Sequence, residues 1–395
     1  MKPAVHLDAR GVGPARARHP WIFSGAVARV AGDPQPGAEV DVLGADGTFL
    51  GRGLFNPHSQ IRVRLYTVED EPLDGAFFAA RVRRAVALRH DLLGLGDPAA
   101  ACRLVFSEGD ELSGLTVDRY GPWVVVVLTG LGMAGRLEPI LDTLDELLQP
   151  AGILLRTEKG VGEEEGLAIR DGLLRGKLPE EPVVIEEGPN RFAVDVRIGH
   201  KTGFYLDQRL NRARVAACAA GRTVADVCTY TGGFAVAAAR AGATGVTGID
   251  TSATALDLAA KNAELNAVAD RVELTRTDAF TWLAEQAEAG RSFDMVVVDP
   301  PRFARSRRGV PSALQGYQRL NRLALGCVAS NGLLATFSCS GRVSTDEFQE
   351  AVRRAAEESG RTVRIIERMT QAPDHPVSTT CPQSAYLKGF LCAVD

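Results

Sequence analysis

The last half of the chain, about residues 186–395, alternates apolar runs with alanine-rich stretches, and no other feature constrains the fold as strongly. The runs expected to form strands are Thr223–Cys228, Gly245–Asp250, Val272–Thr275, Met295–Asp299 and Leu333–Ser338. Helices of about 12 or more residues fit between the first three runs and again between the last two. Repeated strand–helix units imply a parallel sheet covered by helices on both faces. The sequence therefore predicts an α/β domain over residues 186–395.

Two further regions precede this domain. Residues 1–75 carry short β-type runs such as Ile61–Tyr66 between Gly and Pro turns, which predicts a small β-rich module. Residues 76–185 mix helical and β patterns, which predicts a central α+β domain without recognisable chemistry. The Glu- and Pro-rich stretch Pro179–Glu187 is expected to be a linker.

The composition excludes several classes of protein. Seven cysteines without a CxxC pair fit neither a disulfide framework nor a zinc site. No signal peptide is recognisable at the N-terminus, and no stretch approaches the ~18 uninterrupted apolar residues of a membrane span. The formal net charge of −4 gives no global sign of nucleic acid binding. We therefore predict a cytoplasmic protein with no membrane contact and no metal, in which any RNA would bind through local patches.

The N-terminal module places arginines beside aromatic residues. The segment His19–Phe23 contains Trp21, and Arg16 and Arg64 are among the arginines of the module. This mixture suits single-stranded or looped RNA, because bases stack on aromatic rings and phosphates need cations. From the motif alone the stronger interpretation is a packed Trp21 and arginines on a solvated face.

The loop after the first strand of the α/β domain is the expected cofactor site, because ligands of such sheets bind at the carboxyl ends of the strands. It follows Asp226 and contains Thr229, Tyr230, Thr231 and Gly232, all candidates for cofactor contact. The loop lacks the GxGxxG spacing of a dinucleotide site, which argues against NAD. S-adenosylmethionine, which carries no phosphate, needs less of an anion cradle and is the favoured cofactor.

Acidic residues follow the next strands as well. Asp250, with Thr251 beside it, can accept the hydroxyls of an adenosine ribose, and Asp278 can reach the adenine amine. A single acid after a strand often only caps the next helix. Together with Asp226 and Asp299 these acids follow four consecutive strands, which favours the cofactor interpretation.

The fourth strand ends in Asp299-Pro300-Pro301. Two prolines stiffen the loop, so Asp299 and the backbone beside it can bind the Watson–Crick edge of a flipped-out base. Asp299 and Pro300 also face the expected cofactor site. This motif does not separate adenine, guanine and cytosine chemistry, and a proline turn without chemistry is the alternative.

The fifth strand runs into Ser338-Cys339-Ser340-Gly341. Carbon 5 of cytosine takes a methyl group only when a thiolate adds at carbon 6, and a cysteine on a loop beside Asp299 meets that need. No Lys or His flanks Cys339 within two residues, so the group that lowers the pKa of its thiol is not identified by the sequence. Cys339 is therefore the candidate nucleophile.

Several stretches resemble the bacterial large-subunit ribosomal RNA cytosine-C5 methyltransferase family with an N-terminal PUA domain. The matching stretches are His19-Pro-Trp-Ile-Phe-Ser-Gly25, Gly199-His-Lys-Thr-Gly-Phe-Tyr-Leu-Asp-Gln-Arg209, Tyr230-Thr-Gly-Gly-Phe-Ala235, Asp299-Pro-Pro301, Thr336-Phe-Ser-Cys-Ser-Gly341, Asp374-His-Pro376 and Tyr386-Leu-Lys-Gly-Phe390. The similarity spans nearly the whole chain and is weakest in the middle.

The resemblance implies a fold of three parts: a PUA-like β module, a central α+β domain and a class I, Rossmann-like methyltransferase domain. It implies S-adenosyl-L-methionine as the cofactor and 23S rRNA as the partner, with Cys339 as nucleophile. The residues that it adds to the cofactor site are Lys201, Phe204, Asp207 and Arg209. It also raises the RNA-binding interpretation of Arg16, Trp21 and Arg64 above the packing one.

One departure from the wider pattern of RNA cytosine methyltransferases affects product release. Many of these enzymes carry a second cysteine after the first proline of the fourth-strand motif, where this chain has Pro301. Asp299, His375 and water are the open alternatives for the base that acts in release, and a structural turn is the alternative for His375.

Three functions remain in competition. The leading prediction is RNA cytosine-C5 methylation through a covalent cysteine adduct. The same fold can instead methylate an amino group of adenine or guanine, where no thiol is needed, or serve as a non-catalytic RNA-binding protein in ribosome assembly. A homodimer is an open alternative because some relatives with a PUA domain self-associate.

Overall fold

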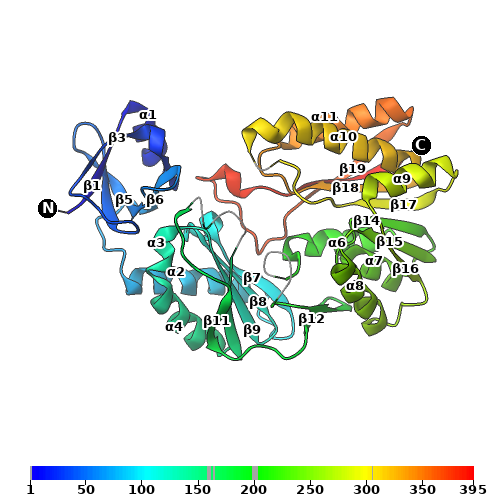
Figure 1. Cartoon of the computed structure of the whole chain (residues 1–395), viewed down its shortest axis with the longest axis horizontal. Helices are drawn as coiled ribbons and strands as arrows, with labels where there is room; N and C mark the ends of the chain where they lie inside the picture. Colours follow the sequence, from blue (N-terminus) through cyan, green and yellow to red (C-terminus); the bar gives the residue numbers. More distant parts are fainter. Residues whose placement is uncertain (1, 158–161, 163–164, 198–202, 305) are drawn as a thin grey trace. The chain divides into compact units, whose positions relative to one another are not determined.

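The computed structural model describes residues 2–157, 162, 165–197, 203–304 and 306–395 (Figure 1). By compactness the chain divides into two discontinuous units. Unit 1 comprises Met1–Val183, Asp195–Phe204 and Pro373–Ser384, and unit 2 comprises Val184–Val194, Tyr205–Ala372 and Ala385–Asp395. The chain therefore passes from one unit to the other several times, and the predicted domain boundaries after residues 75 and 185 stay predictions.

The β-rich module at the start of unit 1 is a six-stranded sheet with the order β2-β6-β5-β4-β1-β3. Its strands are β1 (Ala4–Leu7), β2 (Trp21–Phe23), β3 (Val27–Ala31), β4 (Glu39–Leu43), β5 (Phe49–Phe55) and β6 (Ile61–Thr67). Helix α1 (Ala9–Arg16) starts at Asp8, whose carboxylate accepts hydrogen bonds from two backbone N–H groups of the first turn. Alternate apolar residues of the strands, such as Val40 and Val42, form the core of the module.

The rest of unit 1 is built on a five-stranded sheet with the order β11-β10-β9-β8-β7. Its strands are β7 (Ala101–Phe106), β8 (Leu115–Tyr120), β9 (Trp123–Leu128), β10 (Gly152–Arg156) and β11 (Gly172–Gly176). The helices are α2 (Gly75–Ala87), α3 (Leu131–Ala134) and α4 (Leu137–Leu148). Apolar side chains of α2 and α4 pack in one core with those of β7, β8 and β9, so this part is α+β.

Unit 2 contains a seven-stranded sheet with the order β16-β15-β14-β17-β18-β20-β19. The strands are β14 (Thr223–Val227), β15 (Gly245–Asp250), β16 (Val272–Arg276), β17 (Phe293–Val298), β18 (Val328–Ser338), β19 (Val363–Thr370) and β20 (Lys388–Val394). The first five are parallel, as predicted, whereas β20 runs antiparallel to both β18 and β19. The strand order reverses at β14, which makes the carboxyl ends of β14 and β17 the switch point.

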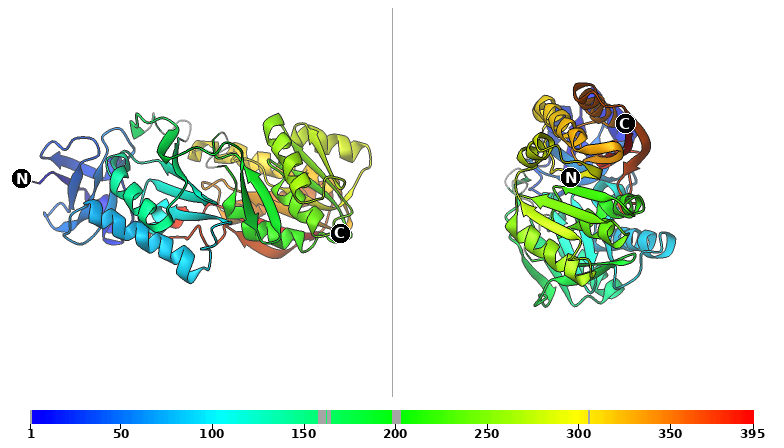
Figure 2. Two further views of the ribbon diagram at one scale, coloured as in Figure 1. Left: turned by 90° about the horizontal axis from the view of Figure 1, so that it is seen from below. Right: turned by 90° about the vertical axis from the view of Figure 1, so that its right-hand side faces the viewer.

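Helices cover both faces of this sheet, as the alternating pattern predicts. They are α6 (Arg209–Ala216), α7 (Gly233–Arg240), α8 (Ala253–Leu265), α9 (Ala279–Glu288), α10 (Val310–Gly326) and α11 (Thr345–Ser359). Figure 1 shows α9, α10 and α11 on one face and α6, α7 and α8 on the other, and Figure 2 gives further views of both layers. Short turns of 3-10 helix lie at Ser24–Ala26, Ser107–Asp110, Leu206–Gln208, Arg307–Gly309 and Pro382–Ser384, and a π-helical turn lies at Leu88–Leu92.

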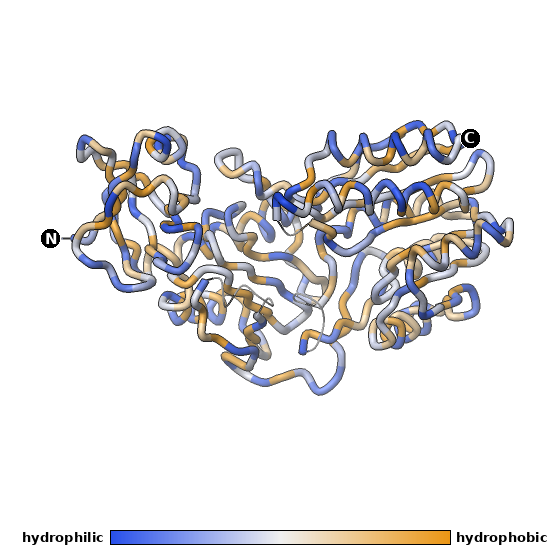
Figure 3. The backbone as a smooth tube through the Cα atoms, turned by 45° about the horizontal axis from the view of Figure 1, so that its top comes forward, coloured by the Kyte–Doolittle hydropathy of each residue, from blue (hydrophilic) through white to orange (hydrophobic). Residues whose placement is uncertain are grey.

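The core of unit 2 follows from the spacing of apolar residues. In α11 the buried residues Phe348, Val352 and Ala355 recur every three or four positions and face the sheet. Figure 3 shows this alternation of hydrophilic and hydrophobic residues along the helices of the unit.

Two local predictions are wrong. Helix α7 has 8 residues rather than 12 or more. The bent loop after β14 takes up the residues as far as Gly232, and the helix ends at Arg240, before the turn that leads into β15. The expected linker Pro179–Glu187 contains a strand, β12 (Val183–Glu187), which pairs with β13 (Asn190–Val194). Val183 and Ile185 alternate with exposed residues, and this burial of every second side chain stabilises a strand despite the flanking glutamates.

None of the helices in the described part of the chain has both the length and the apolar character that crossing a bilayer requires.

Candidate active site at the carboxyl ends of the strands

The loop after β14 is tightly bent. Cys228, Tyr230 and Gly232 have φ angles of 66°, 52° and 80°, in the left-handed region that favours glycine. A Cβ atom on Gly232 would lie 3.1 Å from Cβ of Ala259, so a larger residue would meet both strain and crowding. The predicted contact residues 229–232 therefore lie in one compact turn at the switch point of the sheet.

Asp226 is almost fully buried inside β14, and its carboxylate holds this loop. Oδ2 accepts hydrogen bonds from Thr229 Oγ1 at 2.5 Å and from the backbone N–H of Ala235 at 2.9 Å. Oδ1 has no hydrogen-bond partner among the described residues, and neither does Oγ1 of Thr231. Burial, with a contribution from the charge of Asp250, raises the pKa of Asp226 to about 6. A cationic ligand would favour the ionised carboxylate, which fits the sulfonium and ammonium groups of S-adenosylmethionine.

Asp250 ends β15 and has a partly exposed side chain. One carboxylate oxygen accepts a hydrogen bond from the backbone N–H of Tyr230 at 3.0 Å, and the other from that of Ser252 at 2.9 Å. The side chain of Ser252 caps α8, and Thr251 is exposed beside it. A carboxylate oxygen accepts more than one hydrogen bond, so this geometry is compatible with the expected contact to ribose hydroxyls.

Asp278 follows β16 and is exposed. Its Oδ1 accepts hydrogen bonds from the backbone N–H groups of Phe280 and Thr281 at 3.0 and 3.1 Å. This is the helix cap that the sequence left as the alternative, and the predicted contact of Asp278 with adenine stays a prediction.

Asp299 follows β17 and is partly accessible, although many protein atoms surround its carboxyl group. That burial raises its pKa to about 7, and the charge of Asp207 raises it further. The amide of Gln208 and the guanidinium of Arg212 oppose the shift. Asp299 is therefore one member of an acidic cluster with Asp207 and Asp226, and it titrates near neutral pH.

Cys339 follows β18 and lies beside the double-proline turn. Its Sγ lies 3.9 Å from the backbone carbonyl oxygen of Pro300, and the residue is partly exposed. The adjoining Ser340 Oγ lies 2.9 Å from the hydroxyl of Tyr317 and accepts a hydrogen bond from the backbone N–H of Ala304 at 3.2 Å. The thiol therefore sits on an anchored loop next to the Asp-Pro-Pro motif.

Four of the other cysteines have thiols whose pKa is raised above the ordinary value. Burial raises the pKa of the thiols of Cys327 and Cys381 to about 11 and that of Cys392 to about 12. Burial and the neighbouring acids, first among them Asp250, also raise the pKa of Cys228. These thiols stay protonated at neutral pH, so they are unsuited to nucleophilic attack.

Tyr205, Arg212 and Tyr386 are residues in or near the matched motifs that the sequence did not single out. The ring of Tyr205 contacts that of Tyr230 edge-on, with 5.3 Å between the ring centroids. Burial raises the pKa of Tyr205, and among the neighbouring groups the charge of Cys339 raises it most. Arg212 is buried and forms two hydrogen bonds with Glu187, at 2.7 and 2.5 Å. The hydroxyl of Tyr386 donates to the carboxylate of Asp207. Tyr205 and Tyr386 belong to the matched motifs, where the sequence assigned them no contact, whereas Arg212 lies outside those motifs.

The predicted cofactor residues Lys201, Phe204 and Arg209 differ in where the structure places them. Arg209 begins α6 in unit 2. Lys201 lies outside the described residues. Phe204 belongs to unit 1, where its backbone N–H and carbonyl both hydrogen-bond to the hydroxyl of Tyr120, at 3.2 and 3.3 Å. Cofactor contact by Phe204 stays a prediction.

His375 also belongs to unit 1. It is buried, its Nδ1 lies 3.0 Å from Asp374 Oδ1, and its ring lies 5.2 Å from that of Phe106. Asp374 in turn accepts from the backbone N–H of Arg103, and its carbonyl accepts from the buried guanidinium of Arg89. These contacts fix the segment Pro373–Ser384 within unit 1, in agreement with the structural alternative for His375.

The predicted RNA-binding residues Arg16 and Trp21 are accessible. Arg16 is exposed in the last turn of α1. Trp21 is half-buried, with ring centroids 5.7 Å from His19 and 6.2 Å from Phe23, and its indole N–H donates to Glu108 at 2.8 Å. Phe23 is 47% exposed, so this aromatic row has one open face.

Arg64 has a different environment. It is 9% exposed, and its guanidinium donates to Ser113 Oγ at 3.1 Å, to the carbonyl of Thr129 at 3.0 Å and to Glu165 at 3.1 Å. Its donors are thus taken by internal acceptors, which favours a structural function over the predicted RNA contact. The sequence could not show this because the acceptors, such as Glu165, lie far from Arg64 in the chain.

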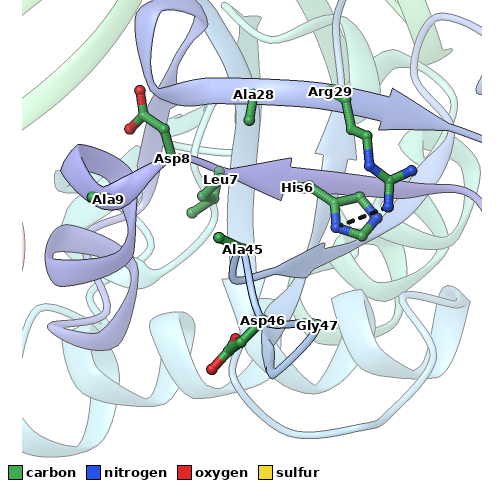
Figure 4. Close-up of a pocket in the computed structure, with 9 residues that line it drawn as sticks. All are labelled: His6, Leu7, Asp8, Ala9, Ala28, Arg29, Ala45, Asp46 and Gly47. Atoms are coloured by element: carbon green, nitrogen blue, oxygen red, sulfur yellow. Dashed lines mark hydrogen bonds between the residues drawn. The ribbon is translucent and has the colours of Figure 1, made fainter.

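A shallow depression of about 600 Å³ opens on the β-rich module (Figure 4). Arg29 and His6 line it, with Arg29 Nη2 3.4 Å from His6 Nδ1, and Asp46 lies on the opposite side. It contains none of the predicted site residues. Among the described residues no group of three or more His, Cys, Asp or Glu side chains is arranged to hold a metal ion.

Comparison with known proteins bears on this arrangement. Residues 5–68 match the PUA-like domain family, and residues 172–391 match the S-adenosylmethionine-dependent methyltransferase family. The ribosomal RNA large subunit methyltransferase I of Tolumonas auensis is 42% identical over 99% of both chains, and that of Vibrio vulnificus is 41% identical over 100% of both.

The crystal structure of SMU.776 complexed with SAH superposes with a TM-score of 0.87 over 99% of both chains, at 21% identity. That likeness concerns the fold, and it agrees with an N-terminal PUA-like module followed by a methyltransferase sheet. The chain therefore belongs to the S-adenosylmethionine-dependent methyltransferase family, with S-adenosylmethionine as its cofactor and a PUA-like domain at its N-terminus.

Proposed function

We propose that this protein methylates carbon 5 of a cytosine in 23S ribosomal RNA through a covalent adduct with Cys339. The substrate class comes from relatives that are named ribosomal RNA large subunit methyltransferase I and match the chain over its whole length. The observation that carries the chemistry is the distance of 3.9 Å between Cys339 Sγ and the Pro300 carbonyl oxygen. A partly exposed thiol beside a base-binding turn suits attack on a pyrimidine ring.

The reaction needs a nucleophilic catalyst because carbon 5 of cytosine by itself is too weak a nucleophile to attack the methyl group. The Cys339 thiolate adds to carbon 6 and forms an S–C6 bond, which makes carbon 5 enamine-like. S-adenosylmethionine, when bound, supplies the methyl group. A base (Asp299, His375 or water) then accepts the proton of carbon 5, and the electron pair of the broken C–H bond forms the C5=C6 double bond. The S–C6 bond breaks in this step, so the thiolate is regenerated.

Asp299 has the properties needed to bind the base. Its pKa of about 7 leaves both protonation states populated at neutral pH. The protonated carboxyl can donate to ring nitrogen 3, which withdraws electrons from carbon 6 and eases thiolate addition. The ionised carboxyl can accept from the exocyclic amine. Pro300 and Pro301 restrict the backbone beside it, so these contacts cost little ordering.

Carboxylates at or near the ends of three adjacent strands support binding of a cationic cofactor. Asp226, Asp250 and Asp299 lie at or near the carboxyl ends of adjacent strands, and Asp226 retains an unsatisfied oxygen among the described residues. We assign Asp250 to the ribose, and the loop 229–232 with Pro300 to close backbone contact. Arg16 and Trp21 are assigned to the RNA on the PUA-like module.

The test is replacement of Cys339 by Ala, with transfer of tritium from labelled cofactor to ribosomal RNA as the measurement. Loss of transfer with unchanged binding of S-adenosylhomocysteine is expected. Cys218→Ser is the matched control, because Cys218 is also partly exposed but lies in the turn after α6. Full activity of Cys339→Ala would refute the covalent step.

Two further measurements separate the alternatives. RNA containing 5-azacytidine should trap the parent protein in a complex that survives denaturation and should not trap Cys339→Ala. Mass spectrometry of the methylated nucleoside distinguishes C-methyl cytosine from an N-methyl purine, and the latter product would favour amino-group methylation with the same fold.

A further inference from the structure

Lys388 has an unusual environment for a lysine. It begins β20 and is 6% exposed. Its Nζ donates to the backbone carbonyl of Ser340 at 2.7 Å and to that of Val343 at 2.6 Å. Both carbonyls belong to the loop after β18, and Ser338, at the end of that strand, is the cross-strand partner of Lys388. One buried ammonium group thus spans the loop that carries Cys339.

Within the part of the chain that the structure describes, no ion pair neutralises the charge of this ammonium. Among the described residues its hydrogen bonds go to carbonyl oxygens, and no carboxylate forms a salt bridge with it. A buried charge without a paired counter-charge is costly, and a protein retains one where its charge is used. Loop anchoring alone does not require a cation, because neutral donors can also bind carbonyl groups.

Two ionisable groups among the described residues act on this charge. Cys339 contributes most to stabilising the ammonium, and Glu347 contributes next, while burial lowers the pKa of Lys388 to about 8. Glu347 is occupied at the start of α11, where its side chain accepts from the backbone N–H of Ser344. Ionisation of the Cys339 thiol would place a negative charge on the same loop whose carbonyl groups bind the Lys388 ammonium.

We propose that Lys388 is a positioning residue that holds the Cys339 loop and stabilises the thiolate form of Cys339. This inference rests on the proposed covalent function, and it identifies the cation that the sequence around Cys339 lacks. A cation near a thiol favours the thiolate, and the effect is strong where water is excluded. The two carbonyl contacts keep the ammonium at the loop without neutralising it.

The test is the pH dependence of alkylation of Cys339 by iodoacetamide, followed on the Cys339 peptide by mass spectrometry. In Lys388→Met the midpoint should rise by about one pH unit relative to the parent, because the cation is lost. This corresponds to about tenfold less thiolate at pH 7. Lys388→Arg should restore most of the shift.

The matched control is Arg361→Met. Arg361 also anchors backbone carbonyls, those of Leu325, Val328 and Ala329, but lies at the far end of β18. Its loss should leave the midpoint unchanged. If Lys388→Met does not fold, Lys388→Gln provides the comparison, since its amide can still donate to a carbonyl but carries no charge.

The proposal is overturned if folded Lys388→Met or Lys388→Gln, judged by circular dichroism and S-adenosylhomocysteine binding, has the parent midpoint. It is also overturned if the parent thiol titrates no lower than an ordinary cysteine, at about 8.5. Alkylation requires no methyl transfer, so this outcome is separate from the activity of Cys339→Ala, which tests the proposed function itself.

Discussion

The backbone N–H of Tyr230 donates a hydrogen bond of 3.0 Å to the carboxylate of Asp250, which joins the loop after the first strand to the end of the second. Tyr230 has a left-handed backbone, with φ of 52°, that this bond helps to hold. Asp250 therefore holds the shape of this loop, and its remaining lone pairs are available for the proposed contact with the ribose.

Replacement of Asp250 by Ala should weaken cofactor binding by about 10- to 100-fold. The change removes a charged acceptor and leaves two backbone N–H groups unpaired, and hydrogen bonds to charged groups contribute roughly 1.5–3 kcal/mol each. Calorimetric titration with S-adenosylhomocysteine measures the effect. Asp257→Asn, an exposed acid on α8, is the control and should bind normally. Unchanged affinity of Asp250→Ala would argue against the ribose assignment.

Stability of the ligand-free protein should fall as pH rises from about 4 to 7. The pKa values of Asp226 and Asp299 in the folded state are about 6 and 7, above the value of about 3.9 in an unfolded chain. The folded state binds more protons in this range, so the stability is complete below the unfolded pKa and is lost as pH rises through the folded values. Denaturant unfolding at pH 5 and pH 8 measures the difference.

Asp299→Asn should reduce this pH dependence and raise stability at pH 8 relative to the parent. Asp294→Asn is the control, because the pKa of Asp294 is shifted in the opposite direction: hydrogen bonds from Thr223 lower it. Its stabilisation is lost only as pH falls through that lowered pKa, so Asp294→Asn should differ from the parent equally at pH 5 and 8. A steeper pH dependence in Asp299→Asn than in the parent would contradict the predicted protonation.

Arg64→Met should destabilise unit 1 without a specific loss of RNA affinity. The change leaves Glu165 and Glu108 buried without their cation, and breaking a buried pair costs about 3–5 kcal/mol. Thermal unfolding measures the loss, and the double change Arg64→Met with Glu165→Gln should recover part of it. An unchanged melting temperature together with weaker RNA binding would restore Arg64 to the RNA surface.

Trp21→Leu and Arg16→Ala should weaken RNA binding in different ways. Loss of a stacking ring costs about 1–3 kcal/mol and leaves the salt dependence unchanged. Loss of one phosphate contact lowers the slope of log affinity against log salt by about one. Filter binding of ribosomal RNA fragments over a range of salt separates the two effects. Arg240→Ala, an exposed arginine at the end of α7, should change neither quantity.

Much of the fold could be predicted because its signals are local. Five apolar runs predicted the parallel strands of unit 2, and the PUA-like module and the cofactor are confirmed by the family matches. The residues that follow these strands, such as Asp250 and Cys339, could be placed at one edge, since parallel strands end on the same side. The local pattern of strands and loops is enough to predict this arrangement, because it does not depend on how distant side chains pack.

Other features depended on contacts between distant segments. Only the burial of Arg64 against Glu165, 101 residues away, showed that its charge is internal. Only the crossing of Pro373–Ser384 into unit 1 showed where His375 lies.

The sequence by itself determined the strand–helix alternation, and it predicted the cofactor loop and Cys339 as the candidate nucleophile, because each of these signals lies in neighbouring residues. The tertiary structure alone decided which charges are buried and paired. Antiparallel pairing of β18 with β20 brings Lys388 to the loop of Cys339, although Lys388 and Ser340 are 48 positions apart in the sequence. The reason is physical: the ionisation of a side chain depends on the atoms that exclude water around it, and folding assembles those atoms from remote parts of the chain.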